Sequence, residues 1–326
     1  MVADPGRPSL LLTVTRRCNL RCAYCPTVKE GLPDLSPADA VRSLRLFEQL
    51  YGGGDCKLFG GEPMLAREAV EAVVEAAPPS VQVYLSTNGM FLDDRLFSML
   101  ERHPRTILTL SLDGEAATHD GLRRMDGAAG PSHAAILAAL PRLLAYPRLV
   151  ITQTIAPSAA KVAAQNFRYL RSLGIRRFNL LPGYYLPWRP EQLAALAAAF
   201  AEIEGEFLRA WASGEYLYLR NLYTRAPTPF FNSGMVVDVD GSIHPSNLIL
   251  AGTWEDLRGF TAVGTLDQPP RREALEQAAR QSGAQIRARL APTVAESTDT
   301  VDALLTALCN RLYPAYFRFR EQRKAA

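Results

Sequence analysis

Roughly the first 180 residues alternate between strand-like and helix-like segments, and this alternation restricts the possible folds more than any other feature of the sequence. Short links between such segments are typical of a parallel sheet covered by helices, so we predict an α/β fold. Six units rather than eight leave two alternatives, a partial barrel and a doubly wound sheet. Both place ligands at the carboxyl ends of the strands. Apolar and β-branched runs predict the six strands at 10–15, 56–59, 81–85, 106–112, 149–155 and 177–181.

The segments between and after these strands predict helices and divide the chain into two regions. Ser36 and Pro37 are a typical helix start, and Pro141 is expected to interrupt one of the later helices. After Pro182 the pattern changes to a long Ala-rich helix, a hairpin around Asp240-Gly241 and two further helices. We therefore predict a core at 1–182 and a C-terminal α+β extension at 183–326. The expected helices of the core lie at 41–50, 65–77, 91–100, 134–144 and 159–173, and those of the extension at 191–212 and within 272–312.

Composition and charge exclude several classes of protein. The chain is 48% hydrophobic and 21% charged, as an ordinary globular protein is. Its net charge of +3 is too balanced for a nucleic-acid-binding surface. No apolar run approaches the roughly 20 residues of a membrane span, and no signal peptide precedes the first strand. We expect a cytoplasmic protein that binds neither nucleic acid nor a membrane.

Three of the five cysteines lie within eight residues, directly after the first predicted strand. Cys18, Cys22 and Cys25 have the spacing C-x3-C-x2-C, which can wrap three thiolates around one metal centre. Four-iron clusters normally take four thiolates, so three would leave one iron open for chemistry. A zinc ion with a fourth ligand from elsewhere is the alternative. The odd cysteine count and a reducing compartment argue against disulfides.

Further motifs follow the next three predicted strands in order. Gly60-Gly61-Glu62-Pro63 follows the second strand, Thr87-Asn88-Gly89 the third and Ser111-Leu-Asp113-Gly114 the fourth, before His119-Asp120 and Arg123. This order strongly resembles the radical S-adenosylmethionine (SAM) enzymes, and most of all the branch that modifies peptides and natural products and carries SPASM or twitch extensions. The resemblance is good over about residues 9–182 and weak over 230–270.

The resemblance implies the partial (β/α)6 barrel of that family and two cofactors, one [4Fe-4S] cluster and SAM. Cys18, Cys22 and Cys25 would bind the cluster, and its open iron would be chelated by the methionine part of SAM. One-electron reduction would then cleave SAM to a 5′-deoxyadenosyl radical that takes hydrogen from the substrate. The cofactor does this chemistry, while the protein aligns the reacting atoms.

The family also implies which residues hold SAM. Gly60, Gly61 and Glu62 would hold its ammonium group, since glycines allow a backbone to approach a ligand closely. Ser111 and Arg123 match the pair that holds its carboxylate, a task that suits the fixed fork of donors on arginine.

Five more positions are expected around the nucleotide or the substrate. Tyr24 would pack near the adenine, and Asn88 and Asp113 would line the nucleotide or substrate region, although both are also common turn residues. Gln153, at the end of the fifth strand, is expected to face the same cavity. Leu181, at the end of the sixth, is expected to offer backbone groups to the adenine.

The extension departs from its family at the auxiliary clusters. The hairpin 235–246 resembles the SPASM hairpin, but Ser246 stands where the family has cysteine, and no cysteine occurs between 57 and 308. We therefore expect one cluster and about four irons per chain. Without an auxiliary cluster to accept an electron, epimerisation, rearrangement, elimination or C–C cleavage is favoured over dehydrogenation.

The expected substrate is a peptide or a small molecule such as a natural product, and the expected electron donor is a flavodoxin or ferredoxin. An epimerase would need a hydrogen-atom donor. Cys309 and Cys56 are the spare thiols, and Cys309 is the candidate, although its apolar helix face favours a core position, as the buried strand does for Cys56. A glycyl-radical activase and a non-enzymatic iron–sulfur or zinc protein are the alternative functions.

Overall fold

Six parallel strands, adjacent in space in the order in which they occur in the sequence, form the centre of the fold. The structure is a computed structural model that describes residues 7–29, 32–125, 131–223, 231–251 and 261–325. All six predicted strands are confirmed to within a few residues at each end. They are β1 (Ser9–Thr15), β3 (Gly54–Gly60), β4 (Val81–Thr87), β5 (Ile107–Ser111), β7 (Leu149–Ile155) and β8 (Arg177–Pro182).

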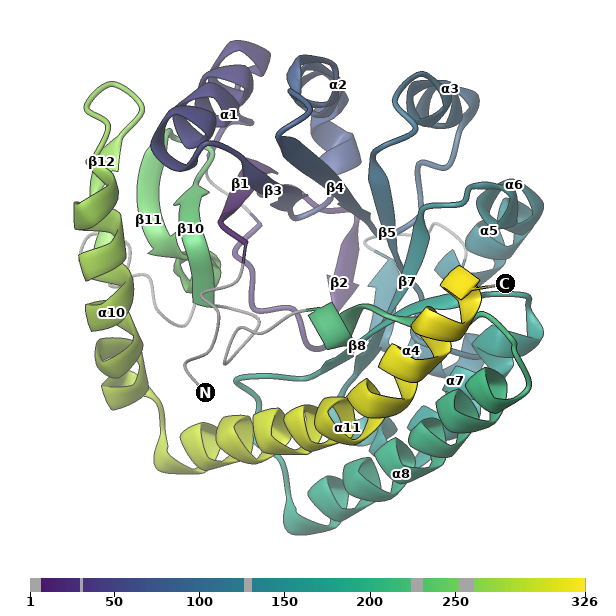
Figure 1. The fold of residues 1–326 in the computed structure, drawn as a ribbon. Helices are drawn as coiled ribbons and strands as arrows, with labels where there is room; N and C mark the ends of the chain where they lie inside the picture. The colour runs from purple at the N-terminus through teal and green to yellow at the C-terminus, as the bar shows by residue number, and fades with distance from the viewer. Residues whose placement is uncertain (1–6, 30–31, 126–130, 224–230, 252–260, 326) are drawn as a thin grey trace.

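Helices cover the outer face of the sheet, as the alternation predicted (Figure 1). Ser36 caps α1 by accepting a hydrogen bond from the backbone N of Asp39 at 3.0 Å, and Pro37 occupies the first turn. The predicted break at Pro141 is confirmed, because the segment forms two short helices. The helices are α1 (Pro37–Tyr51), α2 (Arg67–Ala76), α3 (Asp94–Arg102), α4 (Ala116–Leu122), α5 (Ser132–Ala138), α6 (Leu140–Ala145), α7 (Ala163–Ser172) and α8 (Pro190–Ala212), with 3-10 turns η1 (Pro63–Ala66) and η2 (Pro157–Val162).

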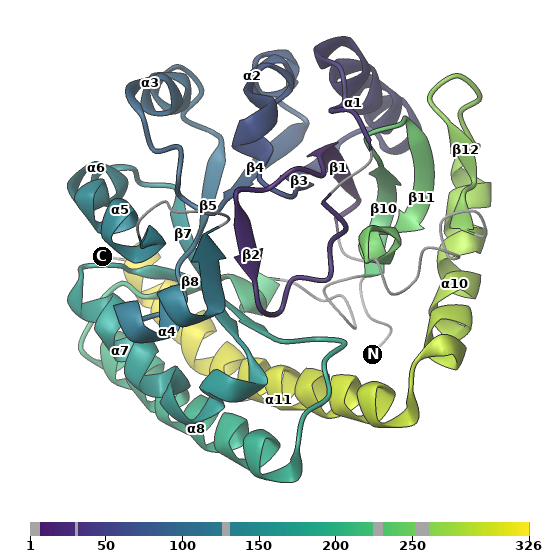
Figure 2. The ribbon, with the colours of Figure 1, turned by 180° about the vertical axis from the view of Figure 1, so that it is seen from behind.

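The strands curve around a central space, so the sheet has an inner face and an outer face (Figures 1 and 2). Alternate residues of β3 and β4 differ in burial, because outward side chains pack under helices and inward ones do not. Outward residues such as Leu12, Leu58 and Leu110 belong to the main core. Leu11 and Val236 belong instead to a separate small apolar cluster. The fold is a partial barrel of the α/β class.

The C-terminal region adds strands to this same sheet. The predicted hairpin is confirmed as β10 (Phe231–Val237) and β11 (Ser242–Ser246), followed by η4 (Asn247–Leu250) and β12 (Gly264–Thr265). β10 pairs in parallel with β1, with Leu10 opposite Met235, so the hairpin joins the sheet of the core and does not form a sheet of its own. At the other edge, β9 (Tyr218–Leu219) pairs with the start of β8 and leads into η3 (Arg220–Tyr223).

Two long helices complete the C-terminal region. α10 (Arg272–Arg289) packs against β10 and β11, and α11 (Pro292–Ala325) packs against α8. Together they cross the open side of the sheet, between its β12 and β9 edges (Figure 2). Two helices were expected here, but α11 continues well beyond residue 312. Within the described residues, no helix has both the length and the apolar character that crossing a membrane requires.

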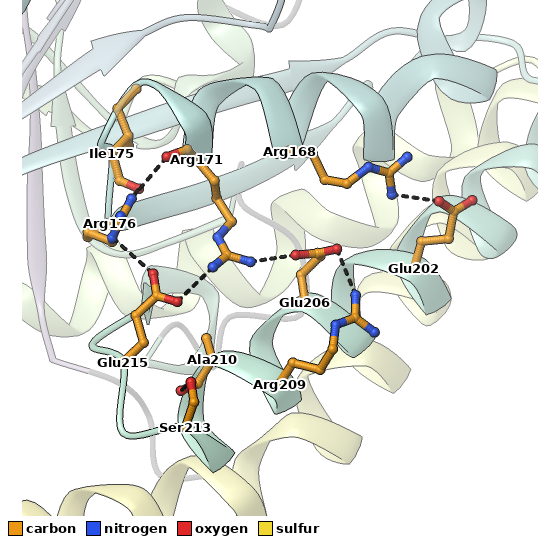
Figure 3. A network of polar contacts seen from close by, with 10 residues as sticks. All are labelled: Arg168, Arg171, Ile175, Arg176, Glu202, Glu206, Arg209, Ala210, Ser213 and Glu215. Carbon is orange, nitrogen blue, oxygen red and sulfur yellow. Dashed lines mark hydrogen bonds and ion pairs between the residues drawn. The ribbon is translucent and has the colours of Figure 1, made fainter.

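An ion-pair network ties α7 to α8, as Figure 3 shows. Arg171 lies between Glu206 of α8 and Glu215, and its Nη2 is 2.9 Å from the Glu215 carboxylate. Arg168 pairs with Glu202 at 2.8 Å one turn away. Because the side chains of Arg171 and Glu206 are only 19% and 15% exposed, water screens this pair less than an ordinary surface pair. The network fixes α8, the helix that supports α11.

Candidate active site

The residues singled out in the sequence follow four neighbouring strands at the same edge of the barrel. The cysteine loop follows β1, Gly60–Glu62 ends β3, Asn88 follows β4 and Asp113 follows β5. Parallel strands bring their carboxyl ends together, which is why motifs far apart in the sequence meet here.

A two-stranded ribbon that the sequence did not predict carries the cysteines. β2 (Leu20–Cys22) pairs antiparallel with β6 (Arg123–Met125), so Cys22 lies opposite Arg123. The backbone N of Ala23 donates to the carbonyl of Leu122 at 2.8 Å and extends this contact. The pairing therefore places the cysteine loop beside the arginine expected to bind SAM.

The three thiols lie near one another without converging on one point. Cys18, Cys22 and Cys25 interact electrostatically, and the Asn88 side-chain amide donates to the Sγ of Cys18 at 3.9 Å. Among the described residues, no three His, Cys, Asp or Glu side chains could hold a single metal ion. A cluster spreads its thiolates over separate irons, so the donor set fits a [4Fe-4S] cluster better than zinc.

Two of these thiols are held in their protonated form by burial. Burial raises the pKa of Cys18, and it raises the pKa of Cys22 to about 11. The positive charge of Lys29 opposes both shifts, and Arg123 opposes that of Cys22. Only thiolates bind iron, so a cluster that bound at this loop would release protons.

Gly60 and Gly61 join the end of β3 to the backbone that precedes Cys18. A Cβ on Gly60, whose φ is +154°, would lie 2.0 Å from the carbonyl oxygen of Thr15. A Cβ on Gly61 would lie 2.1 Å from the carbonyl oxygen of Arg17. We expected these glycines to admit a ligand, but the close approach in the structure is to the protein's own backbone. They set the position of the cysteine loop relative to Glu62.

The Glu62 carboxylate is a buried acceptor between β3 and β4. It is 1% exposed and accepts from the backbone N of Met64 at 3.1 Å, from Thr87 Oγ1 at 2.8 Å and from the backbone N of Asn88 at 2.7 Å. Burial raises its pKa to about 7, while these hydrogen bonds oppose the rise. A carboxylate can accept about four hydrogen bonds, so an ammonium group beside it would find a free acceptor and favour the ionised form.

Asp113, Arg123 and Tyr24 form one buried network. Arg123 donates to Asp113 through Nε at 2.8 Å and Nη2 at 3.0 Å, and Tyr24 donates its hydroxyl to Asp113 at 2.8 Å. Asp113 also accepts from the backbone N of Thr154 at 2.9 Å, and the Arg123 guanidinium lies 5.3 Å from the centre of the Tyr24 ring. We expected Arg123 to offer its fork to SAM. The fork is bound to Asp113 instead, which leaves Nη1 for a further anion.

His119 contacts this network through the backbone of Asp113. Its Nδ1 accepts from the backbone N of Asp113 at 3.2 Å, and its Nε2 lies 3.1 Å from Ser132 Oγ. The ring is 0% exposed, and burial lowers its pKa to about 4, so it is neutral at physiological pH. A neutral ring can accept at one nitrogen and donate at the other, which suits both contacts.

The remaining expected site residues lie on opposite faces of the sheet. Ser111 and Leu181 lie on the inner face and are partly exposed. Gln153 shares the outer face with Ile151 and Ile155, and its amide donates to the carbonyl of Ala163 at 2.9 Å. We therefore correct the expectation for Gln153, which faces the helix layer and not the site.

Cys309 lies on α11 and packs against the main core. It is close enough to Tyr184 to interact with it, and burial raises the pKa of its thiol to about 11. No contact described for Cys309 reaches the cysteine loop, so its role as a hydrogen donor stays a prediction.

Sequence reasoning missed the contacts that hold the cysteine loop from the C-terminal region. Arg16, just before Cys18, is paired with Asp238 after β10, and both are buried. On the other side of the loop, the backbone N of Val28 donates to the carbonyl of Leu250 at 2.9 Å. The partners are more than two hundred residues apart, and no local pattern signals such pairs.

A cavity of about 430 Å³ lies away from this site. It lies at the start of β8, at the opposite end of the barrel from the cysteine loop, and most of its lining is aromatic. Its lining residues are Tyr216, Tyr218, Tyr223, Tyr316, Phe319, Arg320 and Arg323.

The fold and the site together define an enzyme class that joins a three-cysteine loop to an α/β partial barrel. Residues 12–197 match the family model of the Radical SAM superfamily, which is more than half of the chain. The chain belongs to the Radical SAM superfamily, whose cofactors are a [4Fe-4S] cluster and SAM.

Curated relatives match only a part of the chain. It is 27% identical over 124 residues to the Fe-coproporphyrin III synthase of Methanosarcina barkeri, covering 37% of this chain and 31% of that protein. It is 38% identical over 99 residues to the GTP 3′,8-cyclase of Mycobacterium marinum, covering 28% of each. The chain thus matches about a third of the length of these relatives.

Solved structures share the fold over most of the chain. The structure of anSMEcpe with bound AdoMet superposes with a TM-score of 0.69 at 16% identity, covering 84% of this chain and 82% of that one. SuiB of Streptococcus suis bound to its precursor peptide SuiA superposes with a TM-score of 0.55 at 13% identity, covering 76% and 61%. At these identities the likeness concerns the fold alone.

Proposed function

We propose that this enzyme uses a single cluster on Cys18, Cys22 and Cys25 to generate a 5′-deoxyadenosyl radical that abstracts hydrogen from a peptide or small natural-product substrate. The observation that carries the proposal is the ribbon of β2 and β6. It places Cys22 opposite Arg123, on the same barrel edge as Glu62.

The roles of the residues follow from their contacts. When bound, the cluster supplies one electron that cleaves SAM into methionine and the radical. Glu62 accepts from the SAM ammonium, and Nη1 of Arg123, with Ser111, donates to its carboxylate. Asp113 holds the Arg123 fork in place through two hydrogen bonds. Asn88 donates to Cys18, which stabilises the negative charge of the thiolate.

In this proposal Tyr24 and Leu181 contact the nucleotide part of SAM. Tyr24 presents its ring near Arg123 and holds Asp113 through its hydroxyl. Leu181, on the inner face at the end of β8, offers its backbone to the adenine.

The outcome favoured for the substrate is redox-neutral. In the hairpin, Ser246 is 0% exposed and caps η4 by accepting from the backbone N of Leu248 at 3.3 Å. The position that carries cysteine in the SPASM family therefore has a structural role that needs no metal. Epimerisation, rearrangement, elimination and C–C cleavage need no second cluster as electron acceptor. The two substrate classes of this proposal both occur among similar proteins. The name of GTP 3′,8-cyclase gives a small molecule, and SuiB is bound to a peptide.

A flavodoxin or ferredoxin is the electron donor in this proposal, because the cluster must be reduced before each cleavage. We place the enzyme in the cytoplasm, where free thiols persist, since all five cysteines are unpaired.

Anaerobic reconstitution tests the function. The wild-type chain should bind about four irons and form 5′-deoxyadenosine from SAM and dithionite. Cys22→Ala should lose both properties, whereas Cys309→Ala should keep the iron and the 5′-deoxyadenosine. An iron content near eight would contradict the single cluster. A wild-type chain that neither binds SAM nor forms 5′-deoxyadenosine would favour a non-enzymatic metal protein.

A further inference from the structure

The inner face of the barrel is reached by solvent well below the cysteine loop. On β3 and β4 the outward residues are buried, whereas the inward residues Lys57, Phe59, Tyr84 and Ser86 are partly exposed. Helices cover the outer face, so these four side chains meet water from inside the barrel.

Lys57 is a cation on this inner face, and Asp55 on the same face attracts it without forming a close ion pair with it. Its Nζ donates a hydrogen bond to Ser9 Oγ at 3.4 Å, and no carboxylate among the described residues lies within ion-pair distance of it. Asp55, two residues earlier on the same strand face, lies 3.5 Å from Arg7. Arg220 stacks over the Tyr84 ring at 4.1 Å and adds a second positive charge. Burial lowers the pKa of Lys57 to about 8, and Arg220 contributes to that shift, while Asp55 opposes it.

Two hydroxyl groups nearer the cysteine-loop edge than Lys57, one on β1 and one on β5, have no hydrogen-bond partner. Thr13 is 0% exposed and Thr109 is 8% exposed, and the Oγ1 of each is unpaired. Both alternate with outward core residues, so both point to the inner face. A buried hydroxyl without a partner destabilises the fold, and a polar ligand that accepts from it would remove this cost.

We propose that Lys57 binds an anionic group of the substrate, a carboxylate or a phosphate, with Thr13 and Thr109 donating to the same end of the molecule. This inference rests on the proposed function and names the substrate class. Lys57 lies three residues before Gly60, about 10 Å along the strand. The substrate thus carries its negative charge roughly that far from the edge where hydrogen is abstracted.

Lysine labelling of the holoenzyme tests this site directly. The sequence has four lysines, at 29, 57, 161 and 324, so each is resolved by mass spectrometry after a brief anaerobic treatment with an acetylating reagent. Inorganic phosphate, pyrophosphate and succinate are titrated separately, with chloride at matched ionic strength as control. We expect phosphate compounds or succinate to slow acetylation of Lys57 several-fold and to leave the exposed Lys161 unchanged. Protection by phosphate compounds alone identifies a phosphate site, and protection by succinate alone a carboxylate site.

A thermal shift measurement covers the case in which the reagent does not reach Lys57. The effective anion should raise the melting temperature of the wild type and of Lys161→Met, but not of Lys57→Met. The proposal is overturned if no anion protects Lys57 and none produces a melting shift that depends on it. Wild-type formation of 5′-deoxyadenosine without substrate is measured in parallel. If it occurs while protection fails, only this inference is wrong, and if it does not occur, the proposed function is wrong.

Discussion

Replacing Asp238 with asparagine removes the carboxylate that neutralises Arg16 in the loop leading to Cys18. Arg16 is 6% exposed and Asp238 is 0% exposed, and the arginine binds the carboxylate through Nε at 3.2 Å and through Nη2. Removing one partner of a buried ion pair costs about 3–5 kcal/mol, because the other charge stays buried without compensation. We expect Asp238→Asn to lower the free energy of unfolding by that amount.

An exposed pair of the same chemistry provides the control. Arg287 also binds the Asp299 carboxylate through two nitrogens, Nη1 and Nη2, but their side chains are 56% and 53% exposed. Such pairs contribute about 0.2–1 kcal/mol, so Asp299→Asn should cost little. Urea unfolding followed by tryptophan fluorescence, with iron content per chain, measures both variants. Equal losses in the two variants would refute the argument that burial decides the strength of the pair.

Other changes at the site have equally definite expected results. Arg123→Ala should weaken SAM binding in equilibrium dialysis and leave the iron content unchanged. Arg123→Lys keeps the positive charge beside Asp113 and should lose less affinity for SAM. Unaltered SAM affinity in both variants would exclude Arg123 from the SAM site. Gly60→Ala should lower the iron content, because its Cβ would overlap the Thr15 carbonyl, and an iron content equal to that of the wild type would show that the strand end can shift. His119 is neutral when folded, with a pKa near 4 against an ordinary 6.5. The unfolded chain therefore binds more protons between these values, and stability falls as the pH drops from about 6.5 towards 4. In urea unfolding of the cluster-free chain, His119→Gln should flatten this fall, and a slope as steep as that of the wild type would mean that other groups cause it.

Local patterns were sufficient for the strands, most helices and the edge on which the site lies. Apolar runs and the Ser36-Pro37 start depend on neighbours in sequence, so they can be recognised without a structure. The cysteine loop and Glu62 were placed together correctly because parallel strands end at one edge, whatever the details of packing.

Tertiary structure alone decided which groups face one another. Gln153 turned out to face the helices, because a shift of one residue along a strand reverses the side of the sheet. The fork of Arg123 is bound by Asp113, which only the pairing of β2 with β6 brings within reach. β10 lies beside β1, and Asp238 reaches Arg16 across 222 positions of the chain. Contacts of this kind depend on strand register and on which edges pair in space, and spacing along the sequence carries no information about either.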